Sequence, residues 1–130
     1  MHADKTNTIT EIVLSSAFEV SNTLGAGFLE KIYKRALQVE LSLRGLRVTP
    51  EVSFPVSYKG CALGEYFADL VVEDLVVVEI KCAEQLINEH KAQCLSYLRA
   101  SGLSVCLLLN FKKPRVEYKR IVREFDPELS

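Results

Sequence analysis

Two carboxylates and one ammonium group stand at the ends of two neighbouring apolar segments. Asp69 precedes the run at residues 70–72, and Glu79 and Lys81 close the run that begins at residue 75. β-Branched residues dominate both runs, which predicts two strands buried on both faces. Charged groups at the ends of buried strands are costly unless they are paired or bind a metal ion. The pattern therefore indicates either a buried salt bridge of Lys81 or a metal site.

The turn between these strands decides whether the two carboxylates meet. Side chains alternate along a strand, so Glu79 and Lys81 share one face. A two-residue turn would direct Glu79 away from Asp69, whereas a three-residue loop at residues 73–75 would set the two acids directly opposite each other. We therefore predict an odd-length loop or a bulge. Two adjacent carboxylates repel each other, and a divalent cation between them relieves the repulsion.

Length and composition indicate one globular domain. The 130 residues suffice for a core, and 48% hydrophobic with 25% charged residues is the balance of a globular chain. A net charge of −1 excludes a global attraction to nucleic acid, so such affinity requires a local basic patch. Four widely spaced cysteines, no signal peptide and no membrane-spanning run lead us to expect a cytoplasmic protein without membrane contact.

Hydrophobic periodicity predicts the element order α-α-β-β-β-α-β-β. Thr8 and Glu11 form a capping box, so the first helix should begin near Ile9. Asn88 should cap the third helix. The expected helices span residues 9–24, 28–44 and 88–101, and the expected strands span 48–58, 63–72, 75–81, 104–109 and a segment within 112–123. We expect a flexible tail at residues 1–8, one domain at 9–123 and a second tail at 124–130.

The start of the second helix carries Gly27, Glu30 and Tyr33 at intervals of three residues. This spacing places them near one another on the first two turns. A carboxylate in the first turn is stabilised by the helix dipole, and a tyrosine there can simply be half-buried. The spacing leaves a structural and a functional role open for both side chains.

The third helix carries a polar stripe, because His90, Gln93 and Tyr97 share one face. An imidazole, an amide and a phenol in one row are not a core pattern. The stripe is either a solvated face or part of a site.

The C-terminal segment is basic. One acid, Glu117, stands among six cations at positions 112, 113, 115, 119, 120 and 123. Charges on an edge strand commonly prevent aggregation, and that is one interpretation. The other is a rim that contacts phosphates.

Four motifs in this order resemble a known family. They are Gly27-Phe28-Leu29-Glu30-Lys31-Ile32-Tyr33, Asp69 with Glu79-Ile80-Lys81, Gln93-Cys94-Leu95-Ser96-Tyr97, and Leu107-Leu108-Leu109-Asn110-Phe111. The first is similar to the signature of GxxExxY proteins, a branch of the PD-(D/E)XK nuclease superfamily. The second resembles the catalytic D…ExK of that superfamily, and the third the Q-x-x-x-Y helix of the branch related to lambda-type exonucleases. The similarity covers about residues 9–122.

The resemblance implies an α/β fold with a restriction-endonuclease-like core, a central mixed β-sheet of four or five strands flanked by helices. It implies a nuclease that uses Mg²⁺ or Mn²⁺ to hydrolyse phosphodiester bonds in nucleic acid, with DNA as the expected substrate. The implied metal ligands are Asp69, Glu79, the carbonyl of Ile80 and Glu30. Lys81 would orient the attacking water and stabilise negative charge, and Gln93 would hold the water or a phosphate.

The polar stripe, the basic segment and the start of the second helix supply the side chains that we predict to contact the substrate. They are Tyr33, His90, Tyr97, Lys112, Lys113 and Arg115. The alternative is a non-catalytic module that binds nucleic acid or protein on the same fold, since a fold does not guarantee turnover. At this size the chain has little room for separate specificity elements, so we expect a homodimer or another chain to supply them.

Overall fold

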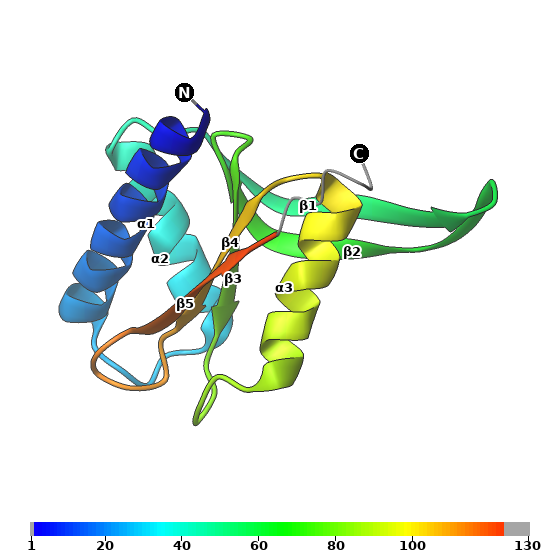
Figure 1. The fold of residues 1–130 in the computed structure, drawn as a ribbon. Coiled ribbons are helices and arrows are strands. Elements are labelled where there is room, and N and C mark those ends of the chain that lie inside the picture. Colours follow the sequence, from blue (N-terminus) through cyan, green and yellow to red (C-terminus); the bar gives the residue numbers. More distant parts are fainter. Residues whose placement is uncertain (1, 124–130) are drawn as a thin grey trace.

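A computed structural model describes residues 2–123 and shows a five-stranded sheet flanked by helices (Figure 1). The elements are α1 (His2–Leu24), α2 (Glu30–Leu43), β1 (Val48–Tyr58), β2 (Cys61–Val72), β3 (Val76–Lys81), α3 (Asn88–Ser101), β4 (Val105–Asn110) and β5 (Glu117–Val122). The strand order is β1-β2-β3-β4-β5, in which β3 and β4 are parallel and the other pairs are antiparallel. The predicted fold class and element order are confirmed.

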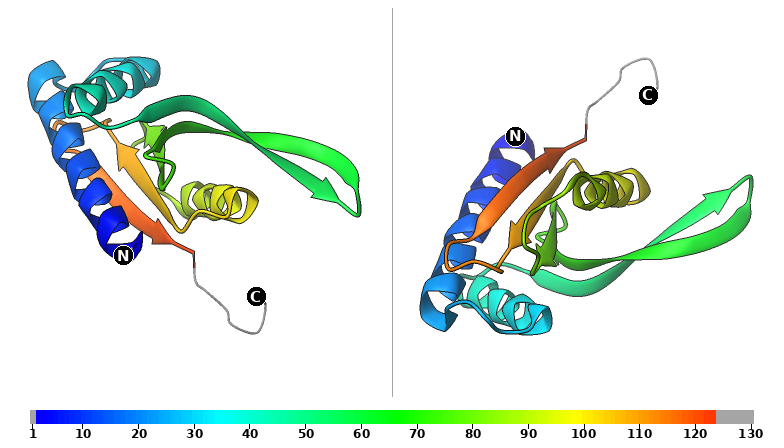
Figure 2. Two further views of the ribbon diagram at one scale, coloured as in Figure 1. Left: turned by 90° about the horizontal axis from the view of Figure 1, so that it is seen from above. Right: turned by 90° about the horizontal axis from the view of Figure 1, so that it is seen from below.

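Helices cover both faces of the sheet (Figure 2). On one face α1 and α2 bury a core that includes Val13, Leu37 and Leu107. On the other face α3 buries a second core that includes Leu98 and Leu108. β3 is buried on both faces, as predicted, and α3 provides the crossover that a parallel β3–β4 pair requires.

The first helix begins at His2, so the prediction of a start near Ile9 after a capping Thr8 was wrong. The Thr8 hydroxyl lies inside the helix and donates to the carbonyl of Asp4 at 3.0 Å. A threonine can satisfy its hydroxyl on the preceding turn in this way, which makes an interior position look like a cap in the sequence. Neither this 23-residue helix nor any other described helix is long and apolar enough to cross a membrane. The predicted tail at 124–130 lies outside the described residues.

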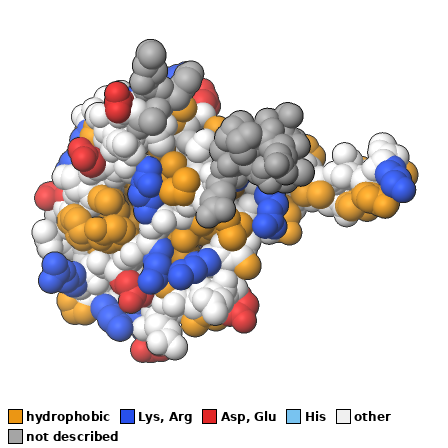
Figure 3. All heavy atoms as spheres, in the orientation of Figure 1, with side chains coloured by type: hydrophobic (Ala, Val, Ile, Leu, Met, Phe, Trp, Pro, Cys, Tyr) orange, Lys and Arg blue, Asp and Glu red, His pale blue; other side chains and the backbone are white. Residues whose placement is uncertain are grey.

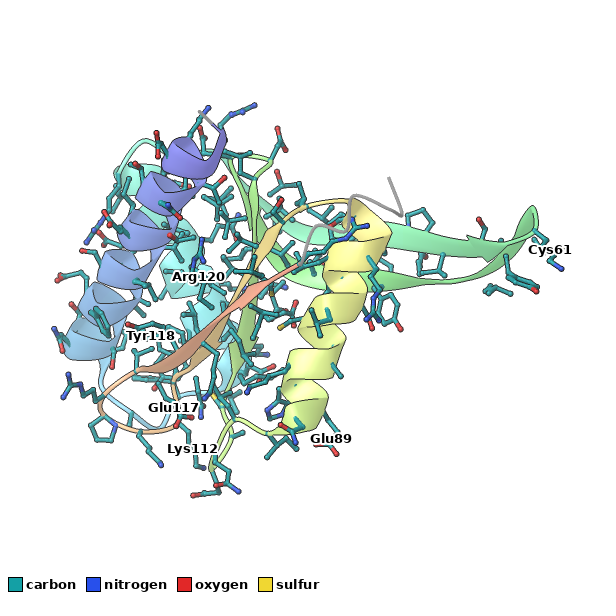
Figure 4. The ribbon with its side chains drawn as sticks, viewed as in Figure 1. Cys61, Glu89, Lys112, Glu117, Tyr118 and Arg120 are labelled. Carbon is teal, nitrogen blue, oxygen red and sulfur yellow. The ribbon has the colours of Figure 1, made fainter. Side chains whose placement is uncertain are left out.

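The hairpin of β1 and β2 projects beyond the body of the molecule, with Cys61 at its tip (Figures 1 and 4). Lys59 and Gly60 form its two-residue turn with φ values of 48° and 81°, as predicted. Side chains on its outer part are exposed, including those of Tyr58 and Leu63. β2 therefore pairs with β3 only through its last residues, Leu70 to Val72.

The loop between β2 and β3 has the predicted odd length. The paired residues are Leu70 with Val78, Val71 with Val77 and Val72 with Val76, which leaves three residues in the loop. Glu73 and Asp74 adopt left-handed φ values of 54° and 55° within it. This register places the next position of β2, Asp69, across from Glu79.

Candidate active site

Asp69 and Glu79 lie where β2 separates from β3. The backbone N–H of Asp69 donates to Glu79 Oε1 at 2.9 Å, and the backbone N–H of Ile80 donates to Asp69 Oδ2 at 2.8 Å. The last paired residues of the two strands are Leu70 and Val78. Beyond this pair the two carboxylates, and not backbone carbonyls, accept the N–H groups of the opposite strand. The main chain thereby sets the positions of both acids.

Glu79 is only 3% exposed, and its surroundings disfavour its charge. Burial and the negative charge of Asp69 raise the pKa of Glu79 to about 8, and Glu30 adds to this. The Asp69 N–H and the charge of Lys81 act in the opposite direction. Two acids that share a site with an excess of negative charge favour a bound cation.

The donor set at this position fits a hard divalent ion in part. Asp69 and Glu79 each use one oxygen on a backbone N–H, which leaves the second oxygen of each for another partner. Oxygen ligands suit Mg²⁺ and Mn²⁺. Within residues 2–123, however, no three His, Cys, Asp or Glu side chains are arranged to hold a metal ion. Glu30 does not join the two strand acids in such a group.

Glu30 is the first residue of α2, and its side chain reaches the main chain just after the end of β3. Its Oε1 accepts a hydrogen bond from the backbone N–H of Cys82 at 3.1 Å. This contact ties the start of α2 to the residue that follows Lys81. Glu30 is therefore beside the strand acids, as the resemblance implies, and its charge acts on Glu79 without a direct contact.

Lys81 is positioned by a series of side chains from α3. Its Nζ donates to Gln93 Oε1 at 3.0 Å, and Gln93 Nε2 donates to the Tyr97 hydroxyl at 3.2 Å. The Tyr97 hydroxyl in turn donates to the carbonyl of Phe67 at 3.0 Å. Burial and the charge of Glu79 raise the pKa of the Tyr97 phenol, which keeps the proton needed for this last bond. The structure thus brings Gln93 and Tyr97 together with Lys81.

Tyr33 lies in the core, although it was predicted to contact substrate. Its hydroxyl donates to the carbonyl of Gly25 at 2.6 Å and accepts from the Phe28 N–H at 3.2 Å. Its ring stacks on Phe111 with 4.8 Å between centroids. Gly27 in the same loop has φ 108°, a conformation that favours glycine. Tyr33 therefore holds the loop that presents Glu30.

His90 serves the start of α3. Its Nδ1 accepts a hydrogen bond from the backbone N–H of Ile87 at 3.1 Å. The N-cap is Ile87 and not Asn88, which corrects the prediction. A side chain three residues into a helix can reach back to the cap residue, as His90 does here, so the cap itself needs no polar side chain.

The loop after β3 is fastened by two residues that the sequence analysis did not assign to the site. The buried amide of Asn110 donates to the carbonyl of Ala83 at 2.8 Å and accepts from its N–H at 3.0 Å. Glu117 Oε1 accepts from the Leu86 N–H at 3.3 Å. The sequence held one signal for Asn110: it is a polar residue at the end of a buried strand, next to the strand that carries Lys81.

Lys112, which Figure 4 labels in the loop between β4 and β5, brings the basic segment close enough for its charge to act on Cys82, the residue after Lys81. Lys112 Nζ lies 3.8 Å from Glu84 Oε1. Burial and the charge of Glu30 raise the pKa of the Cys82 thiol, and the charge of Lys112 opposes them. Lys113 and Arg115 are exposed in the same loop. Lysine and arginine side chains gather on this face of the molecule (Figure 3).

Lys34 is a second cation at the site that the sequence analysis missed. Its Nζ lies 3.8 Å from Asp69 Oδ1 and 3.1 Å from Glu51 Oε1. Lys34 stands four residues after Glu30 and so projects from the same side of α2. That spacing was the signal available in the sequence.

Paired strand acids with a lysine on a helix-flanked mixed sheet define this molecule as a nuclease-like α/β domain. The chain belongs to the PD-(D/E)XK nuclease superfamily, because the model of that family matches residues 7–121. No curated protein matches the chain.

Two solved structures share the fold. The structure of SSO0001 has a TM-score of 0.60 and 20% identity, over 76% of this chain and 52% of that one. The structure of LHK-Exo, an alkaline exonuclease from Laribacter hongkongensis, has a TM-score of 0.53 and 17% identity, over 72% of this chain and 56% of that one. The chain therefore spans about half the length of either protein.

Proposed function

We propose that this chain is a nuclease that uses Mg²⁺ or Mn²⁺ to hydrolyse phosphodiester bonds in DNA. Membership of a nuclease superfamily supports the reaction class. The observation that carries the proposal is the pair of acids held by hydrogen bonds to the main chain, Asp69 and Glu79, with Lys81 on the same strand. Two acids this close disfavour each other's charge, and a bound cation would relieve that repulsion.

Asp69, Glu79 and the carbonyl of Ile80 would hold the ion, with Glu30 nearby. When bound, a divalent ion offsets the charge of the carboxylates and acts as a Lewis acid toward the phosphate. The repulsion that raises the pKa of Glu79 is then relieved. The residues of the chain supply the rest of the chemistry.

Lys81 stabilises negative charge on the phosphate and orients the attacking water. A flexible ammonium group acts as a point charge, so its position depends on what holds it. Gln93 holds Lys81 through the bond at 3.0 Å, and Tyr97 fixes the orientation of the Gln93 amide. Both α3 residues are therefore positioning groups in this proposal.

Substrate binding is assigned to the basic loop. Lys112, Lys113 and Arg115 are exposed and would contact backbone phosphates, a sequence-independent interaction that weakens as salt rises. LHK-Exo, one of the two proteins that share the fold, is an alkaline exonuclease, which supports nucleic acid as the substrate.

Membership of the GxxExxY branch is also part of the proposal. The signature residues of that branch act together here. Gly27 and Tyr33 shape the loop before α2, and Glu30 joins this loop to the residue that follows β3. The domain limits of 9–123, a homodimer and a cytoplasmic location remain proposals. The free thiols of the four cysteines, one of them exposed, support a reducing compartment.

The test is a cleavage assay with labelled single-stranded and double-stranded DNA and RNA, with Mg²⁺ or Mn²⁺ and with EDTA. Cleavage should require the ion and should be lost in Lys81→Ala. Lys59→Ala removes the same charge at the tip of the hairpin and should cleave like the wild type. Equal cleavage by the Lys81→Ala variant would contradict the proposed role.

A non-catalytic nucleic-acid- or protein-binding module is the second candidate. The lack of a third acidic ligand among the described residues favours it. Calorimetry separates the two, because an enzyme of this kind should bind Mn²⁺ and lose that binding in Glu79→Ala. A module of the second kind should bind its partner equally well with EDTA present.

A further inference from the structure

Lys34 faces one of the two proposed metal ligands from inside the protein. Its side chain is 17% exposed, and its Nζ lies 3.8 Å from Asp69 Oδ1. The same Nζ is 3.1 Å from Glu51 Oε1, and the side chain of Glu51 is 74% exposed. The ammonium is therefore shared between an acid at the site and an acid at the surface.

The two oxygens of Asp69 have different partners. Oδ2 accepts the N–H of Ile80 at 2.8 Å, so Oδ1 is the oxygen left for a metal ion. Lys34 lies on the side of that same oxygen. An ammonium and a divalent ion at one oxygen repel each other strongly at such short range.

We propose that Lys34 competes with the metal ion for Asp69, and that it gives up this contact and keeps only its hydrogen bond to Glu51 when the ion binds. This inference rests on the proposed function, since it assumes the metal site at Asp69 and Glu79. Lys34 then balances the charge of the site in the metal-free protein and sets a limit on metal affinity. It is a positioning residue that acts through Asp69.

The backbone of β1 places Glu51 where it can hold Lys34 after Lys34 has left Asp69. Pro50 pairs with Leu70 and Val52 pairs with Ala68, so Glu51 occupies the position across from Asp69. Glu51 has φ 52°, which is uncommon for a residue other than glycine. A lysine side chain can withdraw from one of two carboxylates by rotation of its own bonds, without movement of the main chain.

The first test is a calorimetric titration of Mn²⁺ into the wild type, Lys34→Met and Lys31→Met. Lys34→Met should bind Mn²⁺ about five- to tenfold more tightly, because a positive charge close to a ligand oxygen is removed. Lys31 is exposed on the same helix, so Lys31→Met makes the same change in net charge and should alter the affinity less than about twofold. Equal tightening in both variants would overturn the inference, since it would reflect net charge alone.

The second test asks whether Glu51 acts through Lys34. Glu51→Gln should weaken Mn²⁺ binding several-fold, because Lys34 is then left with Asp69. In the Lys34→Met background the same substitution should change nothing, whereas an independent effect of charge would be additive. Additive effects would overturn the inference.

The outcomes separate this inference from the proposed function. If the wild type binds no Mn²⁺, both fail. If the wild type binds Mn²⁺ and Lys34→Met binds it with unchanged affinity, only the inference fails. Thermal unfolding in EDTA checks that each variant is folded, and Lys34→Gln replaces Lys34→Met in the titration if the latter does not fold.

Discussion

Asp69 and Glu79 are held by backbone N–H groups, whereas Lys81 is held by a series of side chains. The acids bond to N–H groups on the opposite strand at 2.9 and 2.8 Å. The lysine depends on Gln93, which depends on Tyr97, whose hydroxyl bonds to the main chain at Phe67. One half of the site is thus built into the sheet, and the other half is assembled from α3.

This difference predicts how each half responds to substitution. Changes to the acids remove ligand atoms but leave the strands in place, so their effects should be large and local. Substitutions of Gln93 and Tyr97 should displace Lys81 without removing it. Their effects on cleavage should therefore be smaller, and smallest for the residue farther from Lys81.

Asp69→Asn should have the largest effect. The amide oxygen can still accept the N–H of Ile80, but the charge that attracts a metal ion is lost. We expect cleavage to fall by about 10²-fold or more, with little change in melting temperature. Single-turnover kinetics in Mn²⁺ measure the fall. Asp74→Asn, in the exposed part of the β2–β3 loop, is the matched control, and a loss as large in that variant would refute the assignment.

Glu79→Gln should stabilise the metal-free protein, and more so at high pH. The folded-state pKa of Glu79 is raised to about 8 from a usual value near 4.5, so the wild type loses stability as pH rises from 4.5 through 8. Glutamine has no charge to bury and keeps the oxygen that accepts the Asp69 N–H. Thermal unfolding in EDTA should show no gain at pH 4.5 and a gain on the order of 5 °C above pH 8. A gain that is constant with pH would contradict this account.

Gln93→Leu should have an intermediate effect, because Lys81 loses its hydrogen-bond partner but keeps its charge. We expect kcat to fall by about tenfold with little change in KM, since the residue positions another group and binds no substrate. Gln85→Leu removes an exposed amide from the neighbouring loop and serves as the control. A change confined to KM would instead indicate direct contact with substrate.

Tyr97→Phe should have the smallest effect on cleavage. The ring keeps its edge-to-face contact with Tyr66, but the hydroxyl that orients Gln93 is lost. We expect a two- to fivefold fall in kcat and a loss of about 0.5–1.5 kcal/mol in the free energy of unfolding. Denaturant unfolding and steady-state kinetics measure the two effects. A larger loss of activity than in Gln93→Leu would break the proposed order of the series.

The sequence was sufficient for the fold because its signals were local. Alternating and continuous apolar runs predicted the strands. The alternation of side chains between the two faces of a strand predicted the three-residue loop that sets Asp69 across from Glu79. The start of α1 was missed because Thr8 has the side chain of a cap and no tertiary contact is visible in a sequence.

The site was predictable only in part. The alternation of side chains along a strand relates residues on adjacent strands, so this rule applied to Asp69 and Glu79. It cannot show which direction a long side chain takes, and Lys34 was therefore missed. Similarly, spacing placed Tyr33 near Glu30 but could not show that the phenol is buried against Phe111.

The odd number of residues between β2 and β3 constrains how this chain can evolve. Asp74 is exposed and can be replaced without moving either acid, whereas Glu73 accepts a hydrogen bond from the Arg47 N–H and Leu75 packs against the core. A slip of the pairing by one residue would instead set Val78 or Ile80 across from Asp69 and turn Glu79 to the opposite face. Descendants that keep the chemistry should therefore vary most at residue 74 while keeping Val72 paired with Val76.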